Sequence, residues 1–422
     1  MVDFTAAEGF PGARTQPSGV AALQRAMLAF VGIGGAFVFI EPSPYEFATL
    51  AAFVVFVASG LRMRPLFLPM MFLLALMNIG YSTASASLLD QLPVFNWVVT
   101  SWYMAVTAIF FAMAISEDTE GRIDALRRGY MLGALVASFA AIAGYFHLVP
   151  GGDELLTLYG RARGTFKDPN VLGAFLILPA LFALQSVLAD RAGKAFRNGI
   201  VLGVLSLAIL LSFSRAAWGQ LVVTSVFVVA MMFLTSKTHT QRTRIVLVAC
   251  LAIAALVLLL SVLLSLESIS TIFKERASFD QSYDEGRFGR FGRHILGAQM
   301  ALDLPFGIGP LQFTKFFSED THNSFLNAFM SGGWLAGLCY PALSLLTVLL
   351  GWRYLFVQVR WQRAYIAIFA AFLGCVGESL IIDTDHWRHC FMLLGAMWGM
   401  FAATQTELRG AQLSHPRSAT AN

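Results

Sequence analysis

A polar loop changes into a long apolar helix within residues 317–337, FSEDTHNSFLNAFMSGGWLAG. Asp320 and Thr321 are good N-capping residues, and the residues after them are mostly apolar. We therefore expect His322 and Asn323 in the first turn of this helix, at a membrane boundary. The positive end of the helix dipole disfavours a protonated imidazole. His322 then has the profile of a neutral base, and a capping or interfacial histidine is the alternative.

The composition is that of a membrane protein. Of the 422 residues, 57% are hydrophobic and 13% are charged. One soluble core cannot enclose so much apolar surface, and the apolar segments reach the ~20 residues that cross a bilayer. We expect no nucleic-acid partner. The four cysteines lack the spacing of a metal or redox site, so we expect them to pack against other side chains: Cys250, Cys339, Cys375 and Cys390.

Twelve apolar segments predict an all-α integral membrane protein with about twelve transmembrane helices. They begin near Ala21, Tyr45, Pro65, Phe95, Tyr130, Val171, Asn198, Ala217, Ile245, His322, Gln362 and Trp387. Every second connection carries Lys or Arg, whereas the connections after the first and third segments carry none, and this bias predicts that the basic connections and both termini are cytoplasmic. The predicted division is a cytoplasmic arm (1–20), helices one to nine (21–266), an outer segment with an amphipathic helix (267–321), helices ten to twelve (322–406) and a cytoplasmic tail (407–422).

Several cations lie in the outer connections, against this charge bias. The loop GRARGTFKDPN, residues 160–170, carries Arg161 and Arg163 and ends on Asn170. Its Gly and Pro residues predict an ordered turn that could hold a phosphate, and a plain turn with surface arginines is the alternative. Arg215 in SFSRAAW lies between two spans with almost no loop. A cation so close to hydrocarbon needs an anionic partner, either a lipid headgroup or a substrate.

The outer segment contains RFGRFGRHILGAQMALDLP, residues 287–305. Apolar residues at three- and four-residue steps predict a helix that lies in the membrane interface: Phe288, Phe291, Ile295, Ala298 and Leu302. Arg287, Arg290 and His294 repeat on the neighbouring face, so the helix would hold a row of cations at headgroup depth. Simple snorkelling of these side chains is the alternative.

A last polar group lies in GESLIIDTDHWRHC, residues 377–390. We expect Asp383, Asp385 and Arg388 to form a network that orients the substrate cavity on the outer side of the membrane. A metal site is less favoured, because adjacent positions at helix ends give poor ligand geometry.

Four motifs resemble, in this order, those of the O-antigen ligase and O-antigen polymerase family of bacterial inner-membrane glycosyltransferases. They are RARGTFKDPN, SFSR, LPFGIGPLQF and HNSFLNAFMSGGWLAG, and the resemblance extends over about residues 155–337. It implies a helical bundle of the GT-C type with a large periplasmic loop between helices nine and ten. It also implies a polyprenyl-pyrophosphate-linked glycan as donor, and no metal or nucleotide cofactor.

The resemblance carries over residue by residue. The matching positions are Arg161, with Arg163 as an extra cation; Ser214 and Arg215; Arg290, with Arg287 as the alternative; His322 and Asn323; and Gly333. Ala336 departs from the family, which usually has Gly, Thr or Tyr there, so helix packing at this point can differ.

The implied reaction takes place at the periplasmic face of the inner membrane. Arginines hold the donor's pyrophosphate while His322 takes a proton from an acceptor hydroxyl, and a single displacement inverts the anomeric carbon. A lipid A-core acceptor makes the protein an O-antigen ligase, whereas a lipid-linked glycan makes it an O-antigen or exopolysaccharide polymerase. A multi-span transporter and a non-catalytic membrane scaffold are the other classes. A transporter is less favoured, because only Glu378 lies clearly inside a predicted span.

Overall fold

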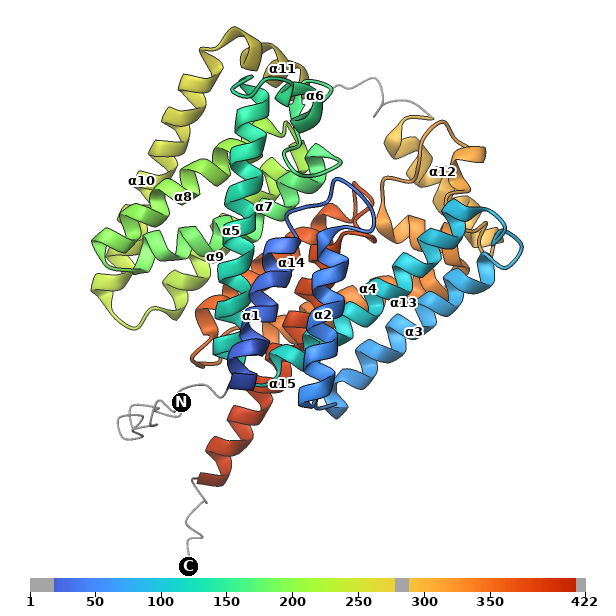
Figure 1. Ribbon diagram of the computed structural model, residues 1–422, viewed down its shortest axis with the longest axis horizontal. Helices are drawn as coiled ribbons and strands as arrows, with labels where there is room; N and C mark the ends of the chain where they lie inside the picture. Colours follow the sequence, from blue (N-terminus) through green and yellow to red (C-terminus); the bar gives the residue numbers. More distant parts are fainter. Residues whose placement is uncertain (1–18, 278–287, 415–422) are drawn as a thin grey trace, which may run out of the picture.

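The computed structural model describes residues 19–277 and 288–414, and most of them are helical (Figure 1). Every predicted apolar segment is a helix. The twelve are α1 (Gly19–Gly34), α2 (Pro44–Ser59), α3 (Leu68–Ala84), α4 (Leu92–Ile115), α5 (Thr119–Tyr145), α7 (Pro169–Ala189), α8 (Ala192–Leu211), α9 (Arg215–Thr235), α10 (His239–Leu264), α13 (Ser324–Tyr354), α14 (Gln362–Glu378) and α15 (Arg388–Ser414). The prediction of an all-α membrane protein is confirmed.

Among the described residues, eight helices are long and apolar enough to cross a membrane. They are α3 with the preceding 3₁₀ turn, α4, α5, α7, α8, α9, α10 and α13. The remaining four predicted segments are α1, α2, α14 and α15, of which the first three have only 16 or 17 residues. The count of twelve membrane crossings therefore stays a prediction.

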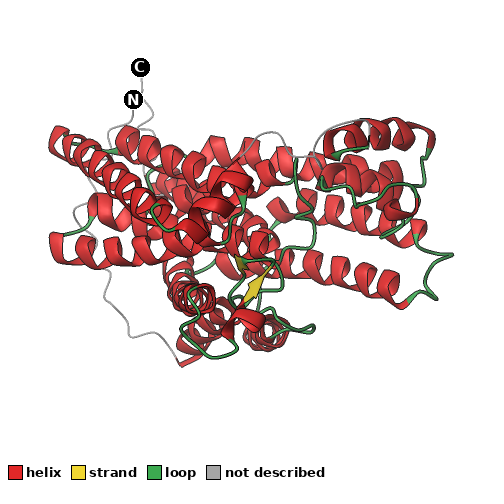
Figure 2. Cartoon of the chain, turned by 90° about the horizontal axis from the view of Figure 1, so that it is seen from above, coloured by secondary structure: helices red, strands yellow, loops and turns green. Residues whose placement is uncertain are grey.

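Short elements connect the long helices. They are η1 (Pro65–Phe67), α6 (Gly152–Leu156), β1 (Thr157–Leu158), β2 (Arg161–Ala162), α11 (Glu267–Ala277), α12 (Arg290–Asp303) and η2 (Phe313–Lys315). Strands β1 and β2 pair antiparallel, and Figure 2 shows this small hairpin among loops and surrounded by helices. The start of α1 and the end of α15 lie together, on the side opposite α11 and α12 (Figure 1).

Glycine lets α1 and α5 touch along their backbones. A Cβ added at Gly129 would lie 1.9 Å from the carbonyl oxygen of Ala29. In a bilayer the lipid tails are as apolar as the side chains, so close van der Waals packing stabilises helix pairs in place of the hydrophobic effect. The α1–α5 contact therefore depends on this glycine.

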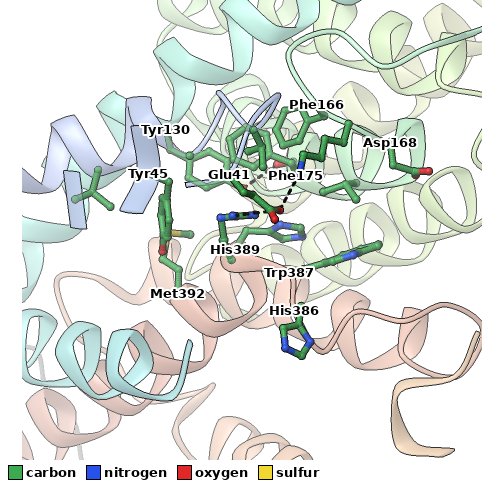
Figure 3. Close-up of a pocket in the computed structure, with 16 residues that line it drawn as sticks. Glu41, Tyr45, Tyr130, Phe166, Asp168, Phe175, His386, Trp387, His389 and Met392 are labelled. Atoms are coloured by element: carbon green, nitrogen blue, oxygen red, sulfur yellow. Dashed lines mark hydrogen bonds and ion pairs between the residues drawn. The ribbon is translucent and has the colours of Figure 1, made fainter. Parts of the chain in front are cut away.

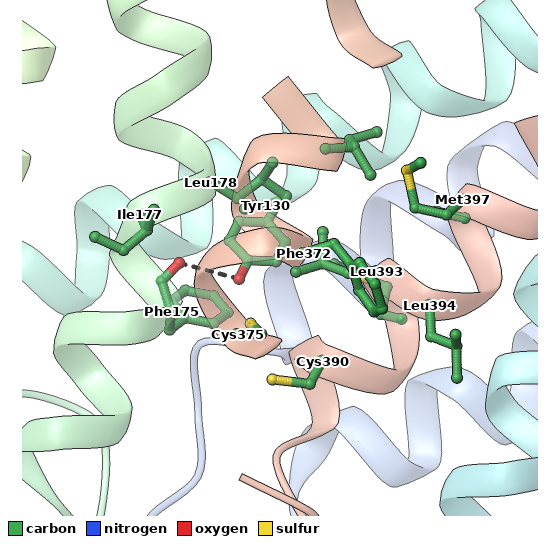
Figure 4. Close-up of a cluster of buried hydrophobic side chains, with 14 of the residues drawn as sticks. Tyr130, Phe175, Ile177, Leu178, Phe372, Cys375, Cys390, Leu393, Leu394 and Met397 are labelled. Atoms are coloured by element: carbon green, nitrogen blue, oxygen red, sulfur yellow. Dashed lines mark hydrogen bonds between the residues drawn. The ribbon is translucent and has the colours of Figure 1, made fainter. Parts of the chain in front are cut away.

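Aromatic packing joins α5 to α7 nearby. The rings of Tyr130 and Phe175 stack 4.2 Å apart, and the Tyr130 hydroxyl donates to the Phe175 carbonyl oxygen at 3.0 Å. Figure 4 shows Cys375 and Cys390 beside this pair. These two thiols and Cys339 are buried, as expected for packing residues, whereas Cys250 is exposed on α10.

Helix α13 is broken at Gly333, whose backbone is left-handed in φ (φ 63°, ψ −163°). The loop after α12 enters the break. The backbone N–H of Trp334 donates to the Pro305 carbonyl (2.9 Å), and that of Ile308 donates to the Met330 carbonyl (2.7 Å). The LPFGIGP loop and the helix that follows His322 are thus one packed unit.

Replacing Gly129 by leucine should disrupt the α1–α5 contact, because overpacking of this kind costs about 1–3 kcal/mol or more. We expect Gly129→Leu to lower the melting temperature and the monodisperse fraction of purified protein. Gly203→Leu on α8 is the matched control, since nothing lies within 4 Å of a Cβ added there. Equal behaviour of the two variants in size-exclusion chromatography would contradict this account of the packing.

Candidate functional site

One large cavity gathers most of the predicted site residues. It has a volume of about 960 Å³ and lies between α9, α14 and the outer loops, and we call it the main cavity. The predicted residues that line it are Arg161, Asn170, Arg215, Arg290 and His322. They come from β2, the first turn of α7, the starts of α9 and α12, and the loop before α13. The fold therefore brings together groups that are far apart in the sequence.

Arg161 is held in place by its neighbours. Its Nε donates to the Ser212 carbonyl oxygen at 2.8 Å, and its Nη2 donates to Oδ1 of Asn170 at 2.7 Å. Arg163 is turned elsewhere, because its guanidinium donates to the carbonyl oxygens of Leu155 (3.2 Å) and Glu154 (3.3 Å). Of the two predicted arginines, only Arg161 lines the main cavity.

Arg215 is the first residue of α9, and Ser214 caps the helix. The Ser214 hydroxyl accepts the backbone N–H of Ala217 at 3.3 Å. The N-terminus of a helix carries a partial positive charge, which here adds to the guanidinium. This corner of the cavity is well suited to an anion.

Arg290 and Phe291 bring the start of α12 to the cavity. Arg293, one turn later, is buried, and its Nη2 donates to Oε2 of Glu319 at 2.5 Å. Arg287 lies outside the described residues, so its predicted contact has no structural account. The predicted apolar stripe of α12 is exposed along its length: Phe288, Phe291, Ile295, Ala298 and Leu302.

His294 does not belong to the expected row of cations. Burial lowers the pKa of its imidazole below the ordinary value, despite a 2.9 Å contact between Nε2 and the Thr321 carbonyl oxygen. Burial thus favours the neutral form of the ring. The sequence pattern showed its place on α12 but not the packing of Thr321 against it.

Asp320 and Thr321 were expected to cap α13, and this prediction was wrong, because the N-cap lies two residues after Thr321. The helix begins at Ser324, and Asn323 is the N-cap, since its Oδ1 accepts the backbone N–H of Leu326 at 3.0 Å. His322 precedes the helix and has a left-handed backbone (φ 47°). Burial, followed by the nearby Asp383 charge, raises the pKa of the Asp320 carboxyl, which accepts only the adjacent Thr321 N–H at 2.8 Å among the hydrogen bonds of the described residues.

Asp383 fixes this turn with one carboxylate. It accepts hydrogen bonds from the Thr321 hydroxyl (2.8 Å) and from the backbone N–H groups of His322 (3.0 Å) and Asn323 (3.0 Å). Its Oδ2 also lies 3.5 Å from Nδ1 of His322. A proton on Nδ1 faces this carboxylate, which leaves Nε2 as the nitrogen that can accept a proton. Nε2 lies 4.0 Å from Oε2 of Glu319.

The expected network of Asp383, Asp385 and Arg388 does not form. Asp385 is buried and accepts the Asn327 amide at 2.8 Å. Arg388 instead pairs with Glu46 of α2 and lies 3.6 Å from Glu41. The connection between α14 and α15 turns between these residues, so they face different neighbours. Of the three, Asp383 is the one in contact with His322.

The structure adds two carboxyl groups that the sequence did not assign to the cavity. Glu319 lines it beside His322, and no spacing rule pointed to this residue. Glu378 is buried farther inside, beside the Gln220 amide, whose nitrogen lies 3.3 Å from both carboxyl oxygens in the orientation that satisfies both groups. In the sequence, the position of Glu378 within an apolar segment was the only indication of this role.

The main cavity has two different ends. Arginines, His322 and Glu319 line the outer end, while Val223 and Phe227 of α9 and Ala370 and Leu373 of α14 line the inner end. An amphipathic ligand with an anionic head and an apolar tail matches this division.

A cluster of possible metal ligands lies apart from this cavity. The candidate ligand atoms of Cys375, His389 and Cys390 are all within 4.8 Å of one another, and all three residues are buried. Two of them were assigned to packing from the sequence, because their separation along the chain resembles no familiar ligand spacing.

Comparison with known proteins agrees with this geometry. Residues 200–340 match the family described as O-antigen ligase. The matched region includes Arg215, Arg290 and His322, whereas Arg161 precedes it. No curated protein matches the chain. Residues 200–340 are about a third of the chain, and this region resembles the O-antigen ligase family.

Proposed function

We propose that this membrane protein transfers a glycan from a polyprenyl-pyrophosphate donor to an acceptor hydroxyl at the periplasmic face of the bacterial inner membrane. One observation carries the proposal: the main cavity joins a cationic end, which also holds His322 and Asp383, to an apolar end. The match of residues 200–340 to the O-antigen ligase family supports glycosyl transfer in general. The start of α1 and the end of α15 lie on one side of the molecule, and α12 lies on the opposite side. This arrangement supports cytoplasmic termini and an outward-facing site.

The donor lies across both ends of the cavity. Arg161, Arg215 and Arg290 contact the pyrophosphate, since guanidinium groups bind phosphate oxygens in a planar, bidentate manner. The polyprenyl chain lies along the apolar residues of α9 and α14. Because hydrogen bonds already orient Arg161, little reorganisation accompanies binding. Preorganised cations of this kind stabilise the charge of a leaving group by about 3–4 kcal/mol.

The acceptor lies beside His322. As its oxygen attacks the anomeric carbon, its proton passes to Nε2 of His322, and the bond from carbon to the pyrophosphate oxygen breaks with its electron pair on the pyrophosphate. Asp383 stabilises the imidazolium at Nδ1, as the carboxylate of a catalytic triad does. The displacement inverts the anomeric carbon. No metal or nucleotide enters this scheme.

We favour a ligase whose acceptor is a lipid A-core sugar. A polymerase that uses a second lipid-linked glycan is the alternative, and acceptor trials separate the two. Purified protein in nanodiscs, given a polyprenyl-pyrophosphate oligosaccharide and each acceptor in turn, should transfer to the lipid A-core glycan. Transfer to the lipid-linked glycan alone would make the protein a polymerase, and transfer to neither would contradict the proposal.

His322→Gln and His322→Ala should both lose about 10²- to 10⁴-fold in transfer rate, because neither side chain can carry the proton. Donor binding should remain, since it depends on the arginines. Single-turnover transfer and binding of labelled donor are the measurements. Near-normal transfer by folded, donor-binding His322→Gln protein would exclude His322 as the base.

Arg161→Lys, Arg215→Lys and Arg290→Lys should each weaken donor binding and lower transfer by about tenfold or more, because a point charge replaces a bidentate contact. Arg163→Lys is the control, since Arg163 lies outside the cavity. If all four variants match the wild type, these arginines only anchor the protein to lipid headgroups.

A further inference from the structure

A second cavity lies beside the main one and shares no lining residue with it. We call it the outer cavity; its volume is about 170 Å³ (Figure 3). The α1–α2 connection contributes Glu41, the start of α7 contributes Asp168, and the start of α15 contributes Trp387 and Arg388. None of the residues that line it belongs to α9 or α14.

The cations of the outer cavity are matched by carboxylates. Lys167, Arg388, Glu41 and Asp168 line it, and Arg388 is also paired with Glu46 of α2. Lys167 and Arg388 both approach the same oxygen of Glu41, at 3.3 and 3.6 Å. The main cavity differs, because it holds three arginines and two carboxyl groups. A net anion is therefore favoured in the main cavity and not in the outer one.

Aromatic side chains line much of the rest of the outer cavity, together with Val31, Val38, Val171, Met392 and two histidines. The aromatic residues are Tyr45, Tyr130, Phe166, Phe175 and Trp387 (Figure 3). Carboxylates accept hydrogen bonds from hydroxyl groups, ammonium and guanidinium groups donate to them, and aromatic faces cover C–H surfaces. A neutral, hydroxyl-rich ring offers hydrogen-bond donors, hydrogen-bond acceptors and C–H surfaces, which match these three kinds of group. This is the chemistry of a sugar residue without a charged substituent.

The two cavities are neighbours through two segments. Asp168 lines the outer cavity and Asn170 the main one, and two residues span at most about 7 Å. The α14–α15 connection likewise presents Ile382 to the main cavity and His386 to the outer one. Asp383, which holds His322, lies between these two residues. The linings of the two cavities therefore lie close together at these two segments.

We propose that the outer cavity binds a neutral sugar of the acceptor glycan, next to the sugar whose hydroxyl reacts at His322. This inference rests on the proposed function and adds a subsite for the acceptor. The acceptor is favoured over the donor because the segment that separates the cavities carries Asp383, the partner of the base. The donor's lipid end lies against α9 and α14 instead.

Glu41→Gln and Lys167→Gln test the subsite. Both side chains are about half exposed (57% and 50%), so loss of their ion pair has little effect on folding. With a lipid A-core acceptor, each variant should raise the acceptor KM at least fivefold and leave kcat and the donor KM within twofold. Asp153→Asn is the matched control, because Asp153 is a half-exposed carboxylate that lines neither cavity.

A shortened acceptor makes the test independent of folding. Removing the sugar next to the reacting one should raise the acceptor KM of the wild type by a similar factor. It should not raise the acceptor KM of Glu41→Gln further, because the variant has already lost the contact with that sugar, and a double-mutant cycle detects such a shared contact. The subsite would be overturned if the effects of the shortened acceptor and of Glu41→Gln on the acceptor KM multiplied. It would also be overturned if only the donor KM rose, or if both variants kept wild-type kinetics. Absence of transfer by the wild type would instead refute the proposed function.

Discussion

The site depends on one carboxylate that three donors share. Asp383 accepts two backbone N–H groups and one hydroxyl at the turn before α13. The left-handed backbone of His322 is strained for a residue with a side chain, at a cost on the order of 1–3 kcal/mol. Hydrogen bonds to a charged acceptor contribute about 1.5–3 kcal/mol each. The two backbone bonds alone therefore offset the strain and hold the imidazole toward the cavity.

This interaction also links distant parts of the chain. Asp383 follows α14, whereas the turn that it holds precedes α13. The backbone N–H of Ser324 donates to the Ser379 carbonyl oxygen at 2.8 Å, which adds a second link between the same segments. The wall of the main cavity that α14 provides and the histidine at its outer end are thus fixed to each other. The geometry of His322 is set by tertiary contacts more than by the helix that follows it.

Much of the fold was predictable because long apolar segments determine where membrane helices lie. The details of the site were less predictable, for specific reasons. Asp320, Thr321 and Asn323 are all capping residue types, and only the position of Asp383 decides which one caps α13. Arg161 and Arg163 look equivalent in a cationic loop, but β2 ends at Ala162, so the second arginine turns toward α6.

The clustering of residues from separate helices was also hidden in the sequence. Arg388 appeared close to Asp383 because five positions separate them, yet its guanidinium pairs with α2. Glu319 gave no signal, since its place depends on the buried Arg293. Local patterns thus identified most of the chemical groups, while contacts between distant segments decided which of them face one another.

The break in α13 changes how mutational data on this protein should be interpreted. A side chain at Gly333 would meet the Pro305 carbonyl oxygen at 2.2 Å, so any substitution there pushes the LPFGIGP loop away from the helix that follows His322. Such a variant can be as inactive as one that lacks a substrate contact, although this glycine does not line the main cavity. Loss of activity at this glycine reports a close contact between two backbone segments, and a genetic screen that scores activity alone would mistake it for a substrate contact.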